Sequence, residues 1–276
     1  MPELPEVESV RRQLEPVMMG ARIVDVELRR PDLRAPFPPR FKARLSGQTI
    51  RSVGRRAKYL LLELSSGEML IMHLGMSGAF YVEPAATALD DEPRLTLHDH
   101  VVFRLEPAAV VTFNDPRRFG FMDLLSAADV RVHPVLSRLG PEPLSDEFDA
   151  VALATACRGK RTSIKVALLD QRVVAGIGNI YASEALHLAG LSPRRRAGSI
   201  ATRSGAPRES AVRLAAAIKK VLGDAVQRIS TRGYRDSRFR VYEREGEPCR
   251  RRGCSGVVRR LTQAGRSTFH CPVCQR

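Results

Sequence analysis

The chain begins with an acidic segment that contains two prolines, Met1-Pro2-Glu3-Leu4-Pro5-Glu6-Val7-Glu8. Proline suits the first turn of a helix, and carboxylates are stabilised at the positive end of the helix dipole. Beyond this start, apolar residues recur at helical spacing at Val7, Val10, Leu14 and Val17. The segment therefore predicts an amphipathic helix that ends near Gly20 and packs its apolar stripe against the body of a domain.

The same segment also permits a chemical interpretation. Removal of Met1, which a small second residue favours, would leave Pro2 with a free secondary amine. An α-amino group has a pKa of about 7.7–8.0, so part of it is neutral and nucleophilic near neutral pH. Such an amine can attack a sugar carbon or an aldehyde and form an iminium. Glu3 adjoins the amine and is placed to move protons, and Glu6 is placed to order the site. A plain helix start and an amine catalyst are both compatible with these eight residues.

Length and composition indicate a globular protein of about two domains. The chain has 276 residues, and 43% of them are hydrophobic, which is enough for real cores. No apolar run reaches membrane-spanning length, and the acidic start lacks the core of a signal peptide. We therefore expect no membrane association and a location in the cytosol.

The charge of the chain indicates a polyanionic partner. The net charge is +15 and the isoelectric point is near 10.4. Nucleic acid fits this charge better than a membrane, because no basic amphipathic anchor helix stands out. A merely solvated basic surface is the alternative, and it accounts poorly for so high an isoelectric point.

Four of the five cysteines lie near the carboxyl end, in the pattern Cys249-x4-Cys254-x16-Cys271-x2-Cys274. In a cytosolic chain this spacing favours metal binding over disulfides. Four thiolates close the tetrahedral shell of Zn²⁺, so the pattern predicts one structural zinc ion. Cys157 is left over, and we expect a buried structural thiol there.

The pattern of strands and helices divides the chain into two halves. The front half predicts short strands, which indicate a two-layer β structure, at 24–28, 59–64, 69–73, 100–105, 110–113 and 121–125. The back half predicts helices at 146–157, 164–169, 179–188 and 208–229. The expected parts are a β-rich domain at 1–127, a linker at 128–145, a helical domain at 146–238 and a zinc module at 239–276.

The β-rich half carries four candidate site residues. Lys58 precedes an apolar strand, either as a surface charge or as a partly desolvated acid, base or phosphate ligand. Met76 lies in a glycine-bounded turn, either as an exposed wedge between bases or as a core methionine. Arg117 and Phe119 share a turn between strands, where arginine can bond an orphaned base or a phosphate and phenylalanine can stack.

The helical half and the cysteine module carry candidate phosphate ligands. Gly178 and Asn179 open a predicted helix, whose free N–H groups suit a phosphate and whose cap we expect to be Asn179. Lys160 and Lys165 precede this helix and add positive charge. Arg266 lies at a predicted hairpin tip, from which it could press onto a DNA backbone.

Taken together, these motifs resemble the formamidopyrimidine-DNA glycosylase family, bacterial enzymes that excise oxidised purines. The resemblance extends over nearly the whole chain, with several independent motifs in one order. The segments that carry it are 2–8, 56–60, 73–78, 98–100, 115–120, 140–144, 178–184 and the four-cysteine module. It implies an α+β multidomain fold: an N-terminal β-sandwich with flanking helices, a helix–two-turns–helix domain and a C-terminal zinc-finger hairpin.

The resemblance also implies catalytic roles in a bifunctional glycosylase and apurinic/apyrimidinic lyase of base-excision repair. Pro2 would attack C1′ of the damaged nucleotide and form a Schiff base, and Glu3 would donate the proton for base release. Lys58 would serve β-elimination, and Arg266 would serve δ-elimination. The implied partner is damaged double-stranded DNA, bound by a monomer.

The resemblance further implies two sets of DNA contacts. The side chains that would fill the gap left by a flipped base are Met76, Arg117 and Phe119. The residues that would hold phosphates are His98, Lys160, Asn179 and Arg266, with Lys165 close by.

One stretch departs from the family pattern. Residues 228–239 are shorter and richer in arginine than the loop that the family usually carries before the finger. The nearest enzymatic alternative is therefore an oxidised-pyrimidine glycosylase of the endonuclease VIII type. A non-catalytic DNA-binding protein and a zinc-ribbon component of a larger assembly are alternatives from other classes. The start at Pro2 and Glu3 argues against a pure DNA-binding protein, which has no use for an amine beside a carboxylate. A zinc-ribbon component would explain the cysteines and the charge but none of the front half.

Overall fold

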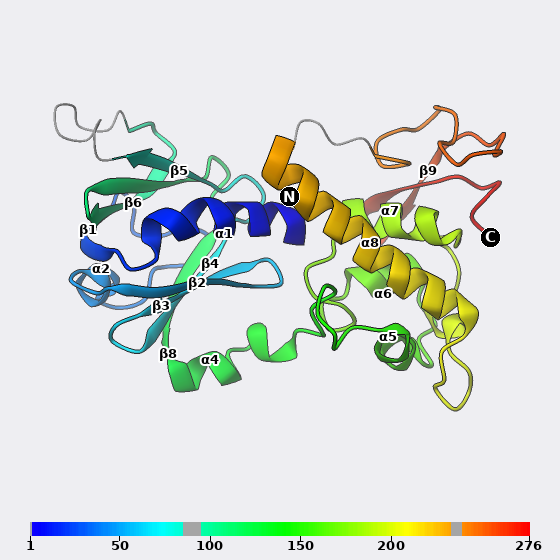
Figure 1. Ribbon diagram of the computed structural model, residues 1–276, viewed down its shortest axis with the longest axis horizontal. Helices are drawn as coiled ribbons and strands as arrows, with labels where there is room; N and C mark the ends of the chain where they lie inside the picture. The colour runs from blue at the N-terminus through cyan, green and yellow to red at the C-terminus, as the bar shows by residue number, and fades with distance from the viewer. Residues whose placement is uncertain (1, 85–94, 233–238) are drawn as a thin grey trace. The chain divides into compact units, whose positions relative to one another are not determined.

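The computed structural model describes residues 2–84, 95–232 and 239–276 of the chain (Figure 1). The chain forms two compact units, Met1–Ser137 and Arg138–Arg276. The division falls inside the segment 128–145, where the sequence predicts a linker.

The first unit contains two four-stranded antiparallel sheets. One sheet has the order β2-β3-β4-β8, with bounds Ile50–Arg56, Tyr59–Leu64, Glu68–His73 and Phe121–Ser126. The other has the order β1-β6-β7-β5, with bounds Arg22–Leu28, Asp99–Glu106, Ala109–Asn114 and Ala79–Pro84. Buried side chains from both sheets share one apolar core, which confirms the expected two-layer β structure.

Two strands of this unit were absent from the sequence-based expectation. β2 and β5 lack a clean apolar and polar alternation, and β2 carries Gly54 and three arginines. Their strand conformation follows from pairing with β3 and β7, which is a tertiary effect.

The predicted amphipathic helix is confirmed as α1, Leu4–Met18. It buries Leu4, Val7, Leu14 and Met18. α1 lies against β2 and β3 of one sheet and β5 of the other (Figure 1). The start of the chain is thereby fixed to the sandwich. Two short helices, α2 (Phe41–Leu45) and α4 (Ala127–Val132), complete the helices described in this unit.

The second unit is helical, as the sequence predicts. Its helices are α5, α6, α7 and α8, with bounds Ala150–Cys157, Ile164–Leu169, Asn179–Ala189 and Glu209–Arg232, and a short 3-10 helix η2 spans Ala197–Ile200. A further 3-10 helix, η1 (Leu136–Arg138), lies at the division between the units. α5 begins four residues later than expected, because Asp149 caps it by accepting a hydrogen bond from the N–H of Ala152 at 2.7 Å. Cys157 is buried as expected, and burial raises the pKa of its thiol to about 11.

The chain ends in a β-hairpin made of β9 (Arg259–Gln263) and β10 (Arg266–His270). Ala264 and Gly265 form its two-residue turn, with φ of 47° and 72°. Positive φ at both positions is typical of the turns that match the twist of a hairpin. Arg266 therefore opens β10 directly after the turn, as predicted. Across the described ranges, no helix combines the length and the apolar character needed to cross a membrane.

Candidate functional site

The amino-terminal residues are held by the first turn of α1. The backbone N–H of Glu3 donates to the carboxylate of Glu6 at 2.8 Å, and the two residues form a reciprocal capping box. Glu3 is 1% exposed, whereas Pro2 is only partly buried. A capping box satisfies backbone donors at a helix start and stiffens it. Pro2 is thus presented from a rigid support, with the Glu3 carboxyl group in a desolvated position.

Lys58 lies in the tight turn between β2 and β3, where Arg56 pairs with Tyr59. Its side chain is 7% exposed. This burial contradicts a surface charge and agrees with the alternative, a desolvated lysine. Ala57, the other turn residue, has φ of 53°, in the left-handed region that non-glycine residues seldom adopt.

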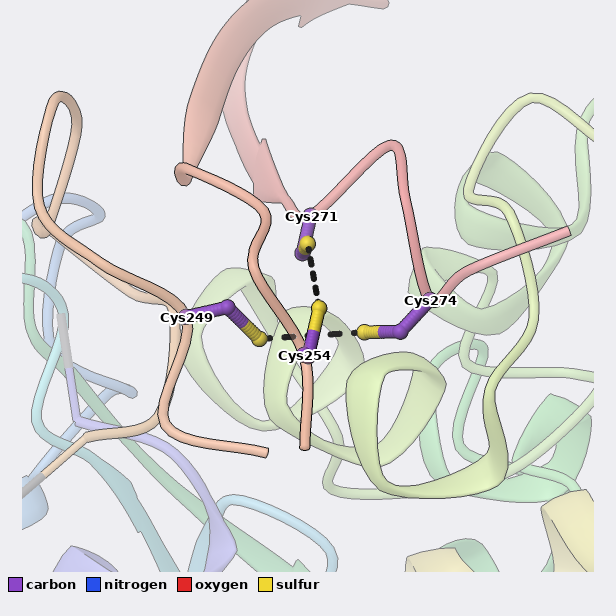
Figure 2. A group of neighbouring side chains, drawn as sticks. All are labelled: Cys249, Cys254, Cys271 and Cys274. Atoms are coloured by element: carbon purple, nitrogen blue, oxygen red, sulfur yellow. Dashed lines mark hydrogen bonds between the residues drawn. The ribbon is translucent and has the colours of Figure 1, made fainter. Parts of the chain in front are cut away.

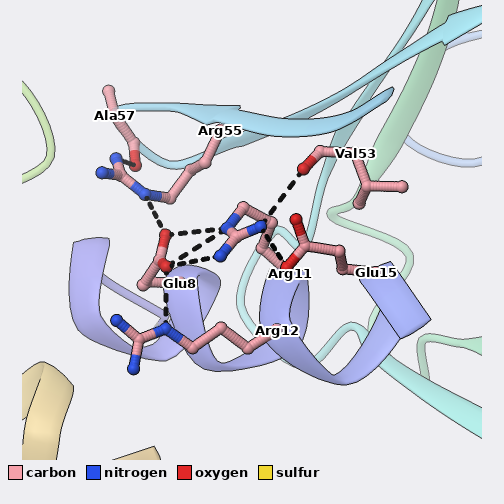
Figure 3. A network of polar contacts seen from close by, with 7 residues as sticks. All are labelled: Glu8, Arg11, Arg12, Glu15, Val53, Arg55 and Ala57. Carbon is pink, nitrogen blue, oxygen red and sulfur yellow. Dashed lines mark hydrogen bonds and ion pairs between the residues drawn. The ribbon is translucent and has the colours of Figure 1, made fainter. Parts of the chain in front are cut away.

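A network of charged side chains ties this turn to α1 (Figure 3). The Arg55 guanidinium donates to the Ala57 carbonyl at 2.8 Å and to Glu8 at 3.1 Å. Glu8 also accepts from Arg11 and Arg12. Burial opposes ionisation of Glu8, but the hydrogen bonds from these three arginines outweigh it and hold the pKa of the carboxyl below its ordinary value. Glu8 therefore anchors the turn that carries Lys58.

His73, at the end of β4, is a neutral neighbour of this turn. Burial, and then the positive charges of Lys58 and Arg34, lower its pKa to about 4. The N–H of Gly75 donates to its Nδ1 at 3.0 Å, which leaves Nε2 to carry the proton of the neutral ring. Its ring stacks on Phe121, with centroids 5.6 Å apart. Lys58 thus has an uncharged imidazole for a neighbour near neutral pH.

Met76, Arg117 and Phe119 lie on two loops that touch. Met76 and Phe119 are each 41% exposed, so the interpretation of Met76 as a core residue is wrong. The Arg117 guanidinium lies 4.9 Å from the centre of the Phe119 ring. A Cβ added to Gly75 would lie 2.2 Å from the carbonyl carbon of Phe119, so only glycine permits this approach. The loops present two apolar side chains and one cation together.

Asp115 holds these two loops together, and it is fully buried. Its carboxylate accepts from the Ser77 hydroxyl at 2.5 Å and from the Gly120 N–H at 2.7 Å. Its carbonyl contacts Nε2 of His100 at 2.9 Å. Sequence reasoning assigned no role to Asp115, which lies in the segment 115–120. The Asp-Pro pair in a loop was its available signal, because aspartate in a turn commonly bonds nearby backbone N–H groups.

His98, an expected phosphate ligand, is exposed on the loop before β6. The neighbouring Asp99 fixes this loop: its carboxylate accepts from the Thr96 N–H at 2.5 Å and from the Asn114 amide at 2.8 Å. The backbone N–H of Asp115 also donates to the His98 carbonyl at 2.9 Å. His98 is therefore available to a ligand on an ordered backbone.

In the second unit, Lys165 and Asn179 differ from the sequence-based expectation. Lys165 is fully buried, and its ammonium donates to Asn179 Oδ1, Thr268 Oγ1 and the Ser267 carbonyl at 2.6, 2.7 and 3.1 Å. It is therefore not offered to a phosphate in this structure. Asn179 is the first residue of α7 and not its cap, which is Gly178. Its amide instead donates to the Ser267 carbonyl at 3.0 Å.

The consequence is that the start of α7 is bonded to the terminal hairpin beside Arg266. Arg266 is exposed, and Lys160 is partly buried. Both cations thus remain available to a ligand, whereas Lys165 acts as an internal clamp between α7 and β10.

The four cysteines of the predicted metal site come together (Figure 2). All four Sγ atoms lie within 4.8 Å of one another, and the pairs Cys249–Cys274 and Cys254–Cys271 are each 3.7 Å apart. Backbone N–H groups of Arg251 and Gly256 point at two of the sulfurs, at 3.4 Å each. Four converging sulfurs with N–H donors around them form a site that could hold a metal ion.

Two residues of α7 that sequence reasoning missed support this module. The Glu184 carboxylate accepts from the N–H groups of Arg240, Val241 and Tyr242, at 2.8, 2.9 and 2.9 Å. His187 is buried, with Nε2 at 3.3 Å from Cys249 Sγ. No local pattern marks these two positions, because their partners lie 56 to 62 residues further along the chain.

Comparison with known proteins agrees with this arrangement. Residues 1–122 match the model of the formamidopyrimidine-DNA glycosylase N-terminal domain, and residues 139–235 match that of its H2TH domain. Curated formamidopyrimidine-DNA glycosylases of Bradyrhizobium sp. strain BTAi1 and Methylocella silvestris are 57% and 54% identical, with 100% of each chain covered. The chain therefore belongs to the formamidopyrimidine-DNA glycosylase family, and it is a DNA glycosylase of base-excision repair.

Solved structures agree with the fold. The Lactococcus lactis enzyme bound to DNA with an AP site aligns with a TM-score of 0.86 at 34% identity over 99% of both chains. The Thermus thermophilus protein aligns with a TM-score of 0.80 at 39% identity, over 99% of this chain and 98% of that one. These neighbours confirm the expected fold class, with a β-rich amino-terminal part, a helical part and a terminal four-cysteine hairpin.

Proposed function

We propose that the protein removes oxidised purines from duplex DNA and then cleaves the strand as a lyase. The observation that carries this proposal is the rigid start of α1, which presents Pro2 next to a buried Glu3 carboxyl group. A Lactococcus lactis relative has been solved with DNA that contains FAPY-dG, an oxidised purine. This likeness supports the same lesion class for this chain.

The proposed reaction starts with the Pro2 amine. Its lone pair attacks C1′, the glycosidic bond breaks, and the base leaves with the bonding electrons and a proton from Glu3. Ring opening of the sugar then gives an iminium between the Pro2 nitrogen and C1′. The iminium acidifies the C2′ protons. Loss of one of these protons expels the 3′ phosphate in β-elimination, which Lys58 serves, and a second elimination served by Arg266 expels the 5′ phosphate.

Exposure and charge support the proposed DNA contacts. A base inside a duplex is unreachable, so it must leave the stack at a cost of a few kcal/mol. Met76 and Phe119 would offset part of this cost by entering the gap, with Arg117 bonding the orphaned base. The proposed phosphate ligands are His98, Lys160 and Arg266, with the N-terminal end of α7 at Asn179. Lys165 would act indirectly, by holding Asn179 and the hairpin in place.

We further propose that Cys249, Cys254, Cys271 and Cys274 hold one structural Zn²⁺ ion. A Zn–S distance of about 2.3 Å in a tetrahedron implies sulfurs about 3.8 Å apart. The two sulfur pairs at 3.7 Å fit this geometry. Such an ion would fold the hairpin module and leave no open coordination position. Metal analysis of purified protein tests this proposal, with one zinc per chain as the expected result and a metal-free active protein as the contrary one.

The proposed working form is a monomer in the bacterial cytosol, where its DNA lies. The net charge of +15 supports a polyanionic partner of this kind.

One observation keeps an oxidised-pyrimidine preference as a second candidate. The alignment with the Bradyrhizobium relative spans 297 positions, against 276 residues in this chain, so some positions of the relative have no counterpart here. A shortened base-recognition loop at 228–239 is consistent with this difference, although residues 233–238 lie outside the described residues.

Borohydride trapping tests the mechanism and the lesion class together. Wild-type protein and a Pro2→Gly variant would be mixed with duplexes that contain 8-oxoguanine, an oxidised pyrimidine or an abasic site. The expected result is a covalent adduct that maps to Pro2, strongest with 8-oxoguanine. Best trapping on the oxidised pyrimidine would favour the second candidate. Tight binding with no adduct on any duplex, or an active preparation that retains Met1, would refute the amine mechanism.

A further inference from the structure

The second unit contains a concave, strongly basic site, of which the proposed function uses only Lys160. It has a volume of about 580 Å³ and is formed by the turn after α5, by η2 and by the loop before α8. We call it the arginine pocket, and its cationic lining residues are Arg158, Lys160, Arg161, Arg196, Arg203 and Arg208.

The walls of the arginine pocket are fixed by backbone contacts. The Gly198 N–H donates to the Lys160 carbonyl at 2.9 Å. A Cβ on Gly198 would lie 3.1 Å from that oxygen, so glycine permits the close approach of η2 to the turn. On the far side, the Thr202 N–H donates to the Ala206 carbonyl at 2.9 Å, and Arg208 Nε donates to the Ala201 carbonyl at 3.2 Å. These contacts therefore hold the walls of the arginine pocket in place.

Most of the charge of the arginine pocket has no close acidic partner; only Lys160 acts on a nearby carboxylate, that of Asp170, whose pKa is lowered first by Arg172 and in small part by Lys160. Its lining contains no aspartate or glutamate, and among the described residues none of its six cations forms an ion pair. Arginines elsewhere on the same unit do pair, such as Arg172 with Asp170 and Arg213 with Glu209. Like charges held together repel one another, so such a cluster favours an external anion.

The lining also indicates which anion fits. Apart from the cations it consists of glycine, alanine, serine and threonine, with no aromatic or large apolar side chain to hold a base. Pockets for small organic ligands are lined mainly by such apolar groups. Repeated cations without a base-binding surface are typical of contacts to a nucleic-acid backbone, which position a duplex without reading its sequence.

We propose that the arginine pocket binds backbone phosphates of the duplex that flanks the lesion. This inference rests on the proposed function, because Lys160 is both a lining residue and a proposed phosphate ligand of the damaged strand. The pocket extends the footprint on DNA beyond the nucleotides that the chemistry needs. Arg161, Arg196 and Arg203 are exposed and carry the added affinity.

The test compares two triple variants that remove the same net charge. One is Arg161→Gln, Arg196→Gln and Arg203→Gln; the control is Arg172→Gln, Arg213→Gln and Lys220→Gln, whose cations are ion-paired and lie outside the pocket. Binding to duplexes with a stable abasic analogue would be measured over a range of salt, with a long duplex and with one trimmed close to the lesion.

On the long duplex, the pocket variant should lose about 0.9 from the salt slope for each phosphate contact removed. At about 0.1 M salt this corresponds to roughly eightfold weaker binding per contact. The control should lose much less, and the trimmed duplex should bind both variants similarly. Equal losses in the two variants, or a loss that does not depend on duplex length, would overturn the proposal.

Two further measurements distinguish DNA binding by the arginine pocket from polyphosphate binding and from a failure of the proposed chemistry. If tripolyphosphate raises the Tm of the wild type but not of the pocket variant, while DNA binding is unchanged, the ligand is a free polyphosphate and the proposal is wrong. Borohydride trapping at saturating DNA should be equal in wild type and pocket variant. A wild type that binds DNA but never traps would refute the proposed chemistry and leave the binding result on the pocket intact.

Discussion

Arg55 donates a hydrogen bond from Nη1 to the carbonyl oxygen of Ala57, 2.8 Å away. Through its Nε the same guanidinium is held by Glu8 of α1, at 3.1 Å. Ala57 has a left-handed backbone and immediately precedes the buried Lys58. One guanidinium thus connects the helix that presents Pro2 to the turn that presents Lys58.

Replacing Arg55 by lysine should impair strand cleavage more than base release. Lysine keeps the charge but loses the planar fork that reaches Glu8 and Ala57 together. The turn would then relax, and misplacement of Lys58 by about 1 Å is expected to slow elimination on the order of tenfold to a hundredfold. Single-turnover rates of base release and of nicking on one duplex measure the two steps separately.

Arg11→Lys is the matched control for this prediction. Arg11 also bonds the Glu8 carboxylate, at 3.1 Å, but its further acceptors are the Val53 carbonyl, in the middle of β2, and the Glu15 carboxylate, and neither lies in the turn. The nicking rate of this variant should stay near that of the wild type. Equal loss of nicking in both variants would mean that the charge network stabilises the fold without positioning Lys58.

The Glu8 carboxylate should make stability depend on pH in the acid range. Its folded-state pKa lies below the ordinary value of 4.5, because the hydrogen bonds from Arg11, Arg12 and Arg55 outweigh burial. Its contribution is therefore present above the unfolded-state pKa and is lost as the pH falls through the folded-state pKa. The difference in unfolding free energy between wild type and Glu8→Gln should be largest near pH 7. It should shrink below about pH 4.5, as urea titrations at several pH values would show. A difference that grows toward acid would contradict the assignment.

Local sequence patterns were enough to predict much of this fold. The helical spacing of Val7 and Leu14 predicted α1, the paired cysteines predicted the four-cysteine cluster, and Ala264-Gly265 predicted the hairpin tip. These features depend on short-range geometry, which a sequence displays directly.

Features that depend on distant contacts could not be predicted in this way. Lys165 looks like a cation beside a phosphate site, yet its acceptors at Ser267 and Thr268 lie about a hundred residues further along the chain. β2 is a strand because it pairs with β3. The role of Asp115 depends on the contact between two loops, since its carboxylate accepts hydrogen bonds from Ser77 in one loop and Gly120 in the other. Motifs marked the candidate site residues, whereas the residues that hold them in place carried no local signal in the sequence.

Gly75→Ala should damage the site that Met76 and Phe119 form. Gly75 has φ of 63°, and the added Cβ would lie 2.2 Å from the Phe119 carbonyl carbon. Both strain and a backbone clash therefore oppose the change, and the two loops should move apart. We expect the substitution to cost more than about 1.4 kcal/mol of loop stability, which corresponds to a factor of about ten. Lesion excision and affinity for a duplex with an abasic analogue should therefore both fall at least about tenfold.

Gly67→Ala supplies the control, because Gly67 has φ of 82° and open space around its Cβ position. It should cost only the left-handed strain, about 1–2 kcal/mol of unfolding free energy, and leave excision unchanged. A Gly75→Ala variant with wild-type excision would show that the contact between the loops is not required.

His187→Phe should weaken the binding of the proposed metal ion by the four cysteines. Nε2 of His187 lies 3.3 Å from Cys249 Sγ and 3.8 Å from Cys274 Sγ, close enough to donate to a thiolate. Phenylalanine fills the space but removes the donor, and loss of such supporting bonds typically costs about 10- to 100-fold in metal affinity. Competition with a chromophoric chelator would measure this loss, and His187→Gln, which retains a donor, should recover part of it.

Because the hairpin module buries only Val241, Val258 and Phe269 in its own apolar cluster, as far as the described residues go, release of the metal should also unfold it. Unchanged chelator kinetics in His187→Phe would assign His187 to packing alone.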